Sequence, residues 1–324
     1  MYSQTETHSV PFDLAGKRVW VAGHTGMVGS ALVRRLQRED CEILSVVRRH
    51  VDLTRQADTE RWIGQARPDV IFVAAAKVGG IAANAAFPAD FIYANTMIAM
   101  NIMKAASSVG TEKMVWFGSS CIYPKYAEQP ILETALLTGS LEPTNEAYSV
   151  AKIAGLKLAQ AYATQHGVCS ISVMPTNLYG PNDNFHPENS HVIPAIMLKM
   201  HMAKTAGDTV VTLWGSGNPL REFLHVDDLA DACVFLARNH AQLPLINIGS
   251  GLELSIRNLS HIVAEVVGYR GRIEFDVSKP DGPPRKLLDS RRLQSLGWAP
   301  RVELLSGLKD LYGRWCHQQN TAAG

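Results

Sequence analysis

The chain has 324 residues, of which 46% are hydrophobic and 19% charged, enough apolar material for one large domain or two intimate ones. Its 31 Lys and Arg against 30 Asp and Glu leave a net charge of +1, which disfavours a non-specific nucleic-acid binder. No apolar run reaches the length of a membrane span, and five scattered cysteines predict no disulfide framework, no metal site and a reducing cytoplasm. Residues 1–16 lack the features of a secretory signal, and we interpret them as a frayed N-terminal extension.

From residue 17 onward, short β-branched runs alternate with longer helical stretches. The pattern predicts strands at 17–23, 42–47, 69–76, 113–120, 169–175 and 245–250, and helices at 27–40, 88–108 and 145–166. Such alternation implies right-handed crossovers and an α/β fold with a doubly wound parallel (Rossmann) sheet. We expect a dinucleotide-binding domain over 17–175 with return segments near 222–250. A smaller α/β substrate-binding lobe would occupy most of 176–324.

A glycine-rich segment with the spacing GxxGxxG joins the first predicted strand to the first predicted helix. Gly23 allows the tight turn, Gly26 lets the backbone approach a pyrophosphate, and Gly29 permits close packing of helix and strand. A glycine-rich turn without a ligand is the alternative. The predicted cofactor-binding residues of this loop are Gly23, His24, Thr25, Gly26, Met27, Val28 and Gly29.

The second predicted strand runs into Arg48 and Arg49, where enzymes that bind NAD usually carry a carboxylate. A guanidinium pairs with the 2′-phosphate that a carboxylate would repel, so the predicted cofactor is NADP(H). A merely solvated turn is the alternative reading of the two arginines. Asp52 could approach the adenine side, and Leu53 beside it is counted with the cofactor-binding residues.

Tyr148 and Lys152 lie four residues apart on the predicted helix 145–166 and therefore share one face. A lysine ammonium one turn away favours the phenolate and can also grip a nicotinamide ribose. Ser119, at the end of the fourth predicted strand, would share a substrate carbonyl oxygen with Tyr148. Together with the glycine loop, these residues predict acid–base chemistry on a substrate carbonyl beside a nicotinamide. Their neighbours Phe117, Gly118 and Ser120 are expected to face the cofactor.

Cys121 follows Ser119 by two residues and would lie beside the nicotinamide. A free cysteine usually packs as a small buried hydrophobic residue. The catalytic hydroxyls next to Cys121 favour a catalytic role instead. His191 precedes a predicted helix containing Pro194, and a cap from Ser190 would let the helix dipole make this histidine a better proton donor. A solvated loop histidine is the equal alternative.

Six longer segments resemble the GDP-L-fucose synthases, a family of 3,5-epimerase/4-reductases within the extended short-chain dehydrogenase/reductases. The segments are AAAKVGGI, FGSSCIYPK, LEPTNEAYSVAKIAG, VMPTNLYGPNDNFHPENSHVIPA, WGSGNPLREFLHVDD and SKPDGPPRKLLD. The resemblance implies conversion of GDP-4-keto-6-deoxy-D-mannose to GDP-L-fucose by 3,5-epimerisation and then NADPH-dependent reduction of the 4-keto group. It also implies a homodimer packed through the helices at 88–108 and 145–166.

The same resemblance assigns roles to individual residues. Cys121 and His191 would be the epimerisation base and acid, with His191 also at the cofactor, and Ser119, Tyr148 and Lys152 would form the reductase triad. Further residues are expected beside the nicotinamide (Pro175, Thr176, Asn177 and Leu178) and around the GDP-sugar (Lys199, Trp214, Arg221 and Asp281). Some family members carry arginine where this chain has Thr25, so the preference for NADPH is expected to be less strict.

Three rival functions remain at this point. A simple 4-reductase of the same or another nucleotide-sugar would have no use for both Cys121 and His191. A 4,6-dehydratase would call for a carboxylate near Ser119, and it or a 4-epimerase would recycle its nicotinamide. A non-catalytic NADP-sensing protein of this fold would not need the reductase triad.

Overall fold

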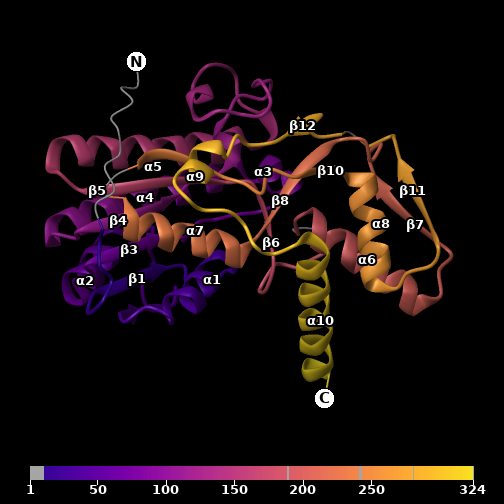
Figure 1. Cartoon of the computed structure of the whole chain (residues 1–324), viewed down its shortest axis with the longest axis horizontal. Helices are drawn as coiled ribbons and strands as arrows, with labels where there is room; N and C mark the ends of the chain where they lie inside the picture. The colour runs from indigo at the N-terminus through magenta and orange to yellow at the C-terminus, as the bar shows by residue number, and fades with distance from the viewer. Residues whose placement is uncertain (1–10, 188–189, 241–242, 280, 324) are drawn as a thin grey trace.

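The computed structural model describes residues 11–187, 190–240, 243–279 and 281–323. Most of the N-terminal half folds around one six-stranded parallel sheet of order β2-β1-β3-β4-β5-β9 (Figure 1). Its strands are β1 (Arg18–Ala22), β2 (Glu42–Leu44), β3 (Val70–Val73), β4 (Lys113–Phe117), β5 (Cys169–Pro175) and β9 (Leu243–Ile248). The predicted doubly wound parallel sheet is therefore confirmed. The predicted strand at 245–250 enters it two residues earlier, as β9 beside β5.

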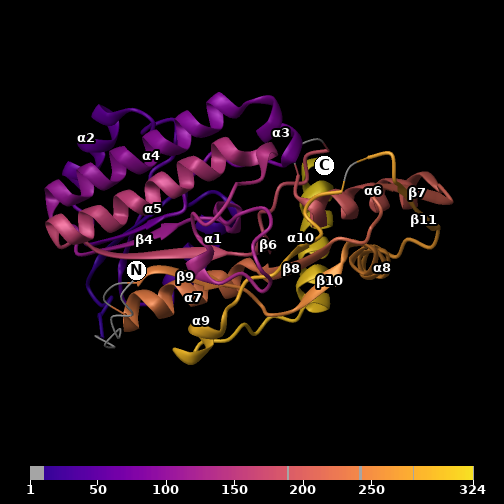
Figure 2. The same cartoon turned by 90° about the horizontal axis from the view of Figure 1, so that it is seen from above.

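Helices cover both faces of this sheet, because its strands are apolar on both sides. One face packs against α1 (Met27–Leu36) and α7 (Val226–Asn239), and the other packs against α2 (Gln56–Ala66), α4 (Pro88–Val109) and α5 (Glu146–His166). Figure 2 shows α4 and α5 side by side above the strands and α7 below them. The first helix ends at Leu36 and not near residue 40, since the next four residues form tight turns.

The strand order reverses between β1 and β3, so the carboxyl ends of these two strands flank a topological switch point, where ligands of open α/β sheets bind. The segments that follow β1, β3, β4 and β5 all begin at this edge. Three short 3₁₀ turns, η1 (Ser120–Ile122), η2 (Glu133–Ala135) and η3 (Pro143–Asn145), and the short helix α3 (Ile81–Ala86) lie in these connections.

A second lobe has its own hydrophobic core, built around Met197, Met200 and Leu259. Its strands form two small sheets: β6 (Asn177–Tyr179), β8 (Leu220–His225), β10 (Glu253–Ser255) and β12 (Arg285–Lys286) in one, β7 (Val210–Trp214) and β11 (Arg272–Asp276) in the other. Its helices are α6 (Val192–Ala206), α8 (Ile256–Val267) and α10 (Leu304–Ala323). The chain returns to the main sheet through α7 and β9, whereas β8 belongs to the second lobe. The short helix α9 (Arg291–Ser295) follows β12, and its Leu293 packs in the core between the main sheet and α7.

The expected frayed extension is wrong for its last residues. Residues 1–10 lie outside the described part of the chain, but Leu14 is only 1% exposed and belongs to the core between the sheet and α7. The amide of Phe12 donates to the carbonyl of Arg238, and the Phe12 ring lies 4.1 Å below the ammonium of Lys113. Lys113 is itself buried, donates to two carbonyls at the end of α7, and has a pKa lowered to about 8 by that burial.

Candidate active site

The glycine loop forms an open cradle at the start of α1. Gly23 has a φ of 83°, and a Cβ atom there would lie 2.8 Å from the backbone of Ala75, which follows β3. A Cβ on Gly29 would lie 2.0 Å from the carbonyl oxygen of Gly23. Gly26 is exposed, caps α1 without a side-chain hydrogen bond, and has no atom nearer than 3.6 Å to a Cβ position. The unpaired N–H groups of the helix thus face an open space, which fits a dinucleotide pyrophosphate.

Arg48 and Arg49 lie in an exposed turn after β2. The Asp52 carboxylate nearby is occupied locally, since its Oδ1 accepts hydrogen bonds from the amide (3.0 Å) and hydroxyl (2.8 Å) of Thr54. Burial works to raise the pKa of Asp52, but these bonds and the charge of Arg48 hold it below its ordinary value. Asp52 therefore faces its own loop, while both guanidinium groups stay accessible to a 2′-phosphate.

Ser119, Tyr148 and Lys152 meet at the carboxyl end of β4. The Ser119 hydroxyl accepts a hydrogen bond from the Cys121 amide at 3.3 Å, which starts η1, and it is also hydrogen-bonded to Tyr148. Lys152 is 3% exposed and donates to the carbonyl of Phe117 at 2.9 Å. Its ammonium lies 5.8 Å from the centre of the Tyr148 ring, and burial lowers the pKa of Lys152 to about 8.

The sequence predicts that Lys152 favours the phenolate of Tyr148, but the surroundings of Tyr148 favour the protonated phenol. Burial raises the pKa of Tyr148 well above its ordinary value, the nearby Cys121 raises it further, and the hydrogen bond with Ser119 only partly opposes this. The phenol consequently keeps its proton at neutral pH. In this state Tyr148 is equipped to donate a proton or hydrogen bond to a carbonyl oxygen, not to remove a proton.

The Cys121 sulfur is half-buried and receives two donors that the sequence did not single out. The Asn145 side-chain amide lies 3.2 Å from the sulfur, and the Lys286 ammonium lies 3.6 Å from it. Both groups stabilise negative charge on sulfur, which is the reactive form of a cysteine. Asn145 was within reach of sequence reasoning, because it precedes Tyr148 by one turn. Lys286 was not, because 165 residues separate it from Cys121.

His191 lies at the start of α6, and the predicted cap by Ser190 is wrong. His191 itself occupies the capping position through its backbone, and the Ser190 hydroxyl is buried with no hydrogen-bond partner among the described residues. The imidazole is exposed, yet the desolvation caused by surrounding protein lowers the pKa of His191. The carbonyl of Ser190 approaches Gly80 after β3, so the histidine loop lies at the same edge of the sheet as the glycine cradle.

The remaining residues predicted beside the nicotinamide follow β4 and β5. Gly118 packs so closely on Met174 that a Cβ atom would lie 2.1 Å from that side chain. Thr176 and Asn177 both donate to the main-chain carbonyl of Glu222, at 3.3 and 2.8 Å. Because Glu222 lies on β8, these bonds fasten the end of β5 to the second lobe.

The four predicted substrate residues lie on the second lobe. Trp214, at the end of β7, is 67% exposed, and the Lys199 ammonium lies 5.6 Å from its ring. Asp281 accepts hydrogen bonds from the amide and hydroxyl of Ser216, and its charge acts on the half-buried Arg221. Arg221 pairs in register with Lys286 across β8 and β12. Arg221 therefore lies between Asp281, in the loop that follows β11, and Lys286, whose ammonium contacts the Cys121 sulfur.

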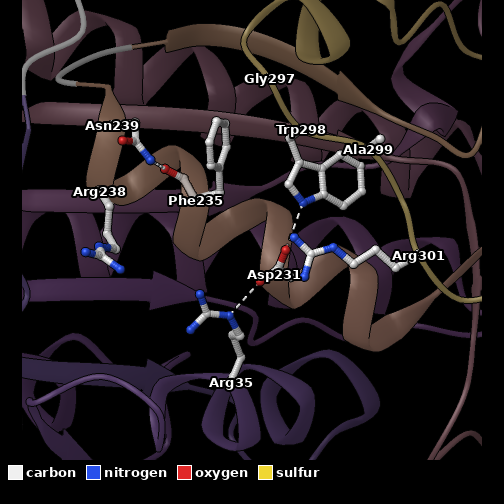
Figure 3. Close-up of a pocket in the computed structure, with 9 residues that line it drawn as sticks. All are labelled: Arg35, Asp231, Phe235, Arg238, Asn239, Gly297, Trp298, Ala299 and Arg301. Carbon is white, nitrogen blue, oxygen red and sulfur yellow. Dashed lines mark hydrogen bonds and ion pairs between the residues drawn. The ribbon is translucent and has the colours of Figure 1, made fainter.

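A cavity of about 280 Å³ lies elsewhere, between α1, α7 and residues 297–301 (Figure 3). Its wall is formed by residues that hold α1, α7 and the segment 297–301 together: Asp231 accepts a hydrogen bond from Arg35 at 2.7 Å and one from the indole N–H of Trp298 at 3.0 Å. None of the residues predicted for catalysis or binding lines it. We therefore assign it no part in the site at the carboxyl edge.

Comparisons with known proteins give a consistent picture. Residues 19–249 match the model of the NAD dependent epimerase/dehydratase family. A GDP-L-fucose synthase 1 of Arabidopsis thaliana is 58% identical over 297 residues, covering 91% of this chain and 92% of that protein. The GDP-L-fucose synthase of Escherichia coli K12 is 49% identical, covering 96% and 100%. A crystal structure of a GDP-L-fucose synthetase from Naegleria fowleri bound to NADP superposes with a TM-score of 0.89 at 26% identity, covering 98% and 99%.

Proposed function

This chain belongs to the NAD dependent epimerase/dehydratase family, and from that premise we propose that it converts GDP-4-keto-6-deoxy-D-mannose to GDP-L-fucose. It first inverts C3 and C5 of the sugar and then reduces the C4 carbonyl with NADPH. The observation that carries the proposal is that the residues for proton removal and the residues for carbonyl reduction lie at one site. The Ser119 hydroxyl contacts both the amide of Cys121 and the phenol of Tyr148, so a sulfur base and an oxyanion clamp face the same place.

The cofactor is NADP(H). The cradle of Gly23, Gly26 and Gly29 holds its pyrophosphate, and Arg48 and Arg49 hold its 2′-phosphate. Lys152, anchored on the carbonyl of Phe117, is placed to grip the nicotinamide ribose. When bound, NADPH supplies the hydride that reduces the C4 carbonyl.

The GDP moiety lies along the line from Trp214 to Cys121. The exposed indole of Trp214 stacks on the guanine, and Arg221, which pairs in register with Lys286, binds the diphosphate. Lys199 and Asp281 frame the same pocket. This direction brings the sugar to Cys121 and Tyr148, with the GDP held while the sugar ring shifts between the two epimerisations.

Epimerisation begins at a carbon that flanks the C4 carbonyl and is therefore acidified by it. The Cys121 thiolate, supported by Asn145 and Lys286, removes the proton. Negative charge develops on O4, where Tyr148 and Ser119 donate hydrogen bonds. His191 gives a proton to the opposite face of the same carbon, which inverts it. The lowered pKa of His191 weakens its hold on that proton.

Reduction uses the same oxyanion clamp. Tyr148 is protonated at neutral pH, because burial raises its pKa, and it gives its proton to O4 as the C4 carbonyl becomes an alcohol. The charged Lys152 beneath the ring stabilises the phenolate left behind, which then recovers a proton from solvent. One clamp thus serves both enolisation and reduction.

The test is NADPH oxidation by the purified protein with GDP-4-keto-6-deoxy-D-mannose, compared with a Cys121→Ser variant. We expect the wild type to consume NADPH and form GDP-L-fucose. The variant should lose exchange of the C3 and C5 protons with solvent while its NADPH affinity stays unchanged. Consumption of NADPH with formation of the unepimerised alcohol would identify a simple reductase. Absence of consumption by the wild type would favour the NADP-sensing alternative.

We also propose a homodimer formed through α4 and α5. These helices lie side by side (Figure 2). Large apolar side chains on them are exposed, and so is Phe87 directly before α4; those on the helices are Ile92, Tyr93, Met100 and Val150. A second copy docked on this face would cover them in a four-helix arrangement. Sedimentation of the wild type and of a Tyr93→Asp variant tests this, with a dimer expected for the first and a monomer for the second.

No helix among the described residues is both long enough and apolar enough to cross a membrane. All five cysteines carry free thiols. With Cys121 required as a thiolate, we propose the reducing cytoplasm as the place of action.

A further inference from the structure

A lysine that no part of the proposed mechanism uses lies at the outer end of the GDP-sugar line. The Lys279 ammonium is 5.7 Å from the centre of the Trp214 ring. The side chain is exposed, and no hydrogen-bond acceptor for its ammonium occurs in the part of the chain that the structure describes. A cation at an open aromatic platform, with no acceptor of its own, is available to a ligand that stacks there.

The turn that carries Lys279 is fixed beside Trp214. Asp276 pairs in register with Trp214 across β11 and β7, and its main-chain carbonyl accepts from the amides of Gly215 (3.0 Å) and Lys279 (3.2 Å). Its carboxylate accepts from the amide and hydroxyl of Ser278 at 3.0 and 2.6 Å. The backbone of Lys279 is thus held in place against the indole before any ligand arrives.

Other charged groups near the indole are already engaged. Each carboxylate oxygen of Asp281 accepts one hydrogen bond from Ser216, which fixes the orientation of this side chain and leaves each oxygen a further lone pair. The Lys199 ammonium donates to the carbonyl of Thr212 at 3.3 Å. The Lys279 ammonium donates to no acceptor among the described residues, although its charge acts on the neighbouring Asp276 carboxylate.

Guanine and adenine differ at the base edge that carries atom N7 and the substituent on C6, where a lysine can donate a hydrogen bond. Guanine offers two acceptors there, O6 and N7, whereas adenine replaces O6 with an amino donor that would oppose an ammonium. We propose that Lys279 is a specificity-determining residue, which donates to the O6/N7 edge of a guanine stacked on Trp214 and thereby selects guanine over adenine. This inference rests on the proposed function, which places GDP at the same indole.

The experiment measures dissociation constants of GDP, inosine diphosphate and ADP by calorimetry, for the wild type and for Lys279→Met and Lys279→Arg. Inosine diphosphate keeps O6 and N7 but lacks the 2-amino group. We expect the wild type to bind GDP and inosine diphosphate about tenfold more tightly than ADP, which is the usual size of one hydrogen bond to a charged group. In Lys279→Met, GDP and inosine diphosphate should weaken about tenfold while ADP changes less than about twofold. Lys279→Arg should keep the selectivity.

The matched control is Lys309→Met, which removes an exposed lysine on α10 and should leave all three constants unchanged. NADPH affinity of each variant reports that the fold is intact. An equal loss for all three nucleotides in Lys279→Met would mean that the lysine acts on the diphosphate, and would overturn the inference. So would an unchanged ratio of GDP to ADP affinity, or an inosine diphosphate affinity that Lys279→Met leaves unchanged. Turnover of the GDP-sugar, measured on the same wild-type preparation, decides the proposed function separately.

Discussion

Replacing Gly29 by alanine tests whether the cofactor cradle depends on close contact between α1 and the loop before it. The new Cβ would lie 2.0 Å from the carbonyl oxygen and 2.6 Å from the carbonyl carbon of Gly23, and 2.7 Å from the Cα of His24. All three are backbone atoms, so no side chain can turn away. Since comfortable contacts between such atoms begin near about 3.5 Å, the loop must move by roughly 1 Å or more.

The cost of this overpacking is about 1–3 kcal/mol, which lowers the melting temperature by several degrees at about 2–4 °C per kcal/mol. A 1 Å displacement of the N–H groups that face the pyrophosphate should weaken NADPH binding by about tenfold or more. Thermal unfolding followed by circular dichroism, and a fluorescence titration with NADPH, measure the two effects.

Gly64→Ala is the matched control. Gly64 lies on the exposed side of α2, and a Cβ atom there has no neighbour within 4 Å. Alanine is the better helix former by about 1 kcal/mol, so this variant should be slightly stabilised and bind NADPH normally. If Gly29→Ala matched the wild type in both melting temperature and NADPH affinity, the assignment of this loop as a close-packed cofactor cradle would be refuted.

Three further predictions concern the cofactor and the clamp. Replacing Arg48 and Arg49 together by alanine should raise the NADPH Michaelis constant about tenfold while that of NADH changes little, and an equal change for both would argue against a 2′-phosphate contact. Tyr148→Phe should lower the rate of NADPH oxidation about a hundredfold or more with unchanged NADPH affinity, whereas wild-type turnover would remove Tyr148 from proton transfer. Because burial lowers the pKa of Lys152 to about 8, its charge is lost as the pH rises through that value, so turnover should fall on the alkaline side. Lys152→Arg keeps the charge and should remove this alkaline limb from the pH profile of its residual activity; an unaltered limb would contradict the assignment.

The sequence predicted the nucleotide-binding half well because its signals are local. The strands β1, β3 and β4 are short runs that are apolar after at most one charged residue, β5 is rich in β-branched and apolar residues, and the glycine loop follows β1 directly. The predicted strand ends were less accurate: β2 stops at Leu44, where its pairing with β1 ends. Apolar residues continue beyond Leu44, at Val46 and Val47, so the composition does not show where the hydrogen bonds between β2 and β1 end.

Features that depend on distant pairs could not be predicted. Lys286 reaches Cys121 because β12 pairs with β8, and that pairing has no local signature. The high pKa of Tyr148 arises from burial by several elements, whereas the sequence displayed only the lysine one turn away. Leu14 illustrates the same limit, since its burial requires α7, more than 200 residues later in the chain.

The central claim is that one site both epimerises and reduces the sugar. The most direct measurement incubates the protein with GDP-4-keto-6-deoxy-D-mannose and NADPH in deuterated water and locates deuterium in the product by NMR. We predict stoichiometric loss of NADPH and a GDP-L-fucose labelled at both C3 and C5. Loss of NADPH with an unlabelled product would contradict the account, because Cys121 and His191 would then have exchanged no proton with the substrate.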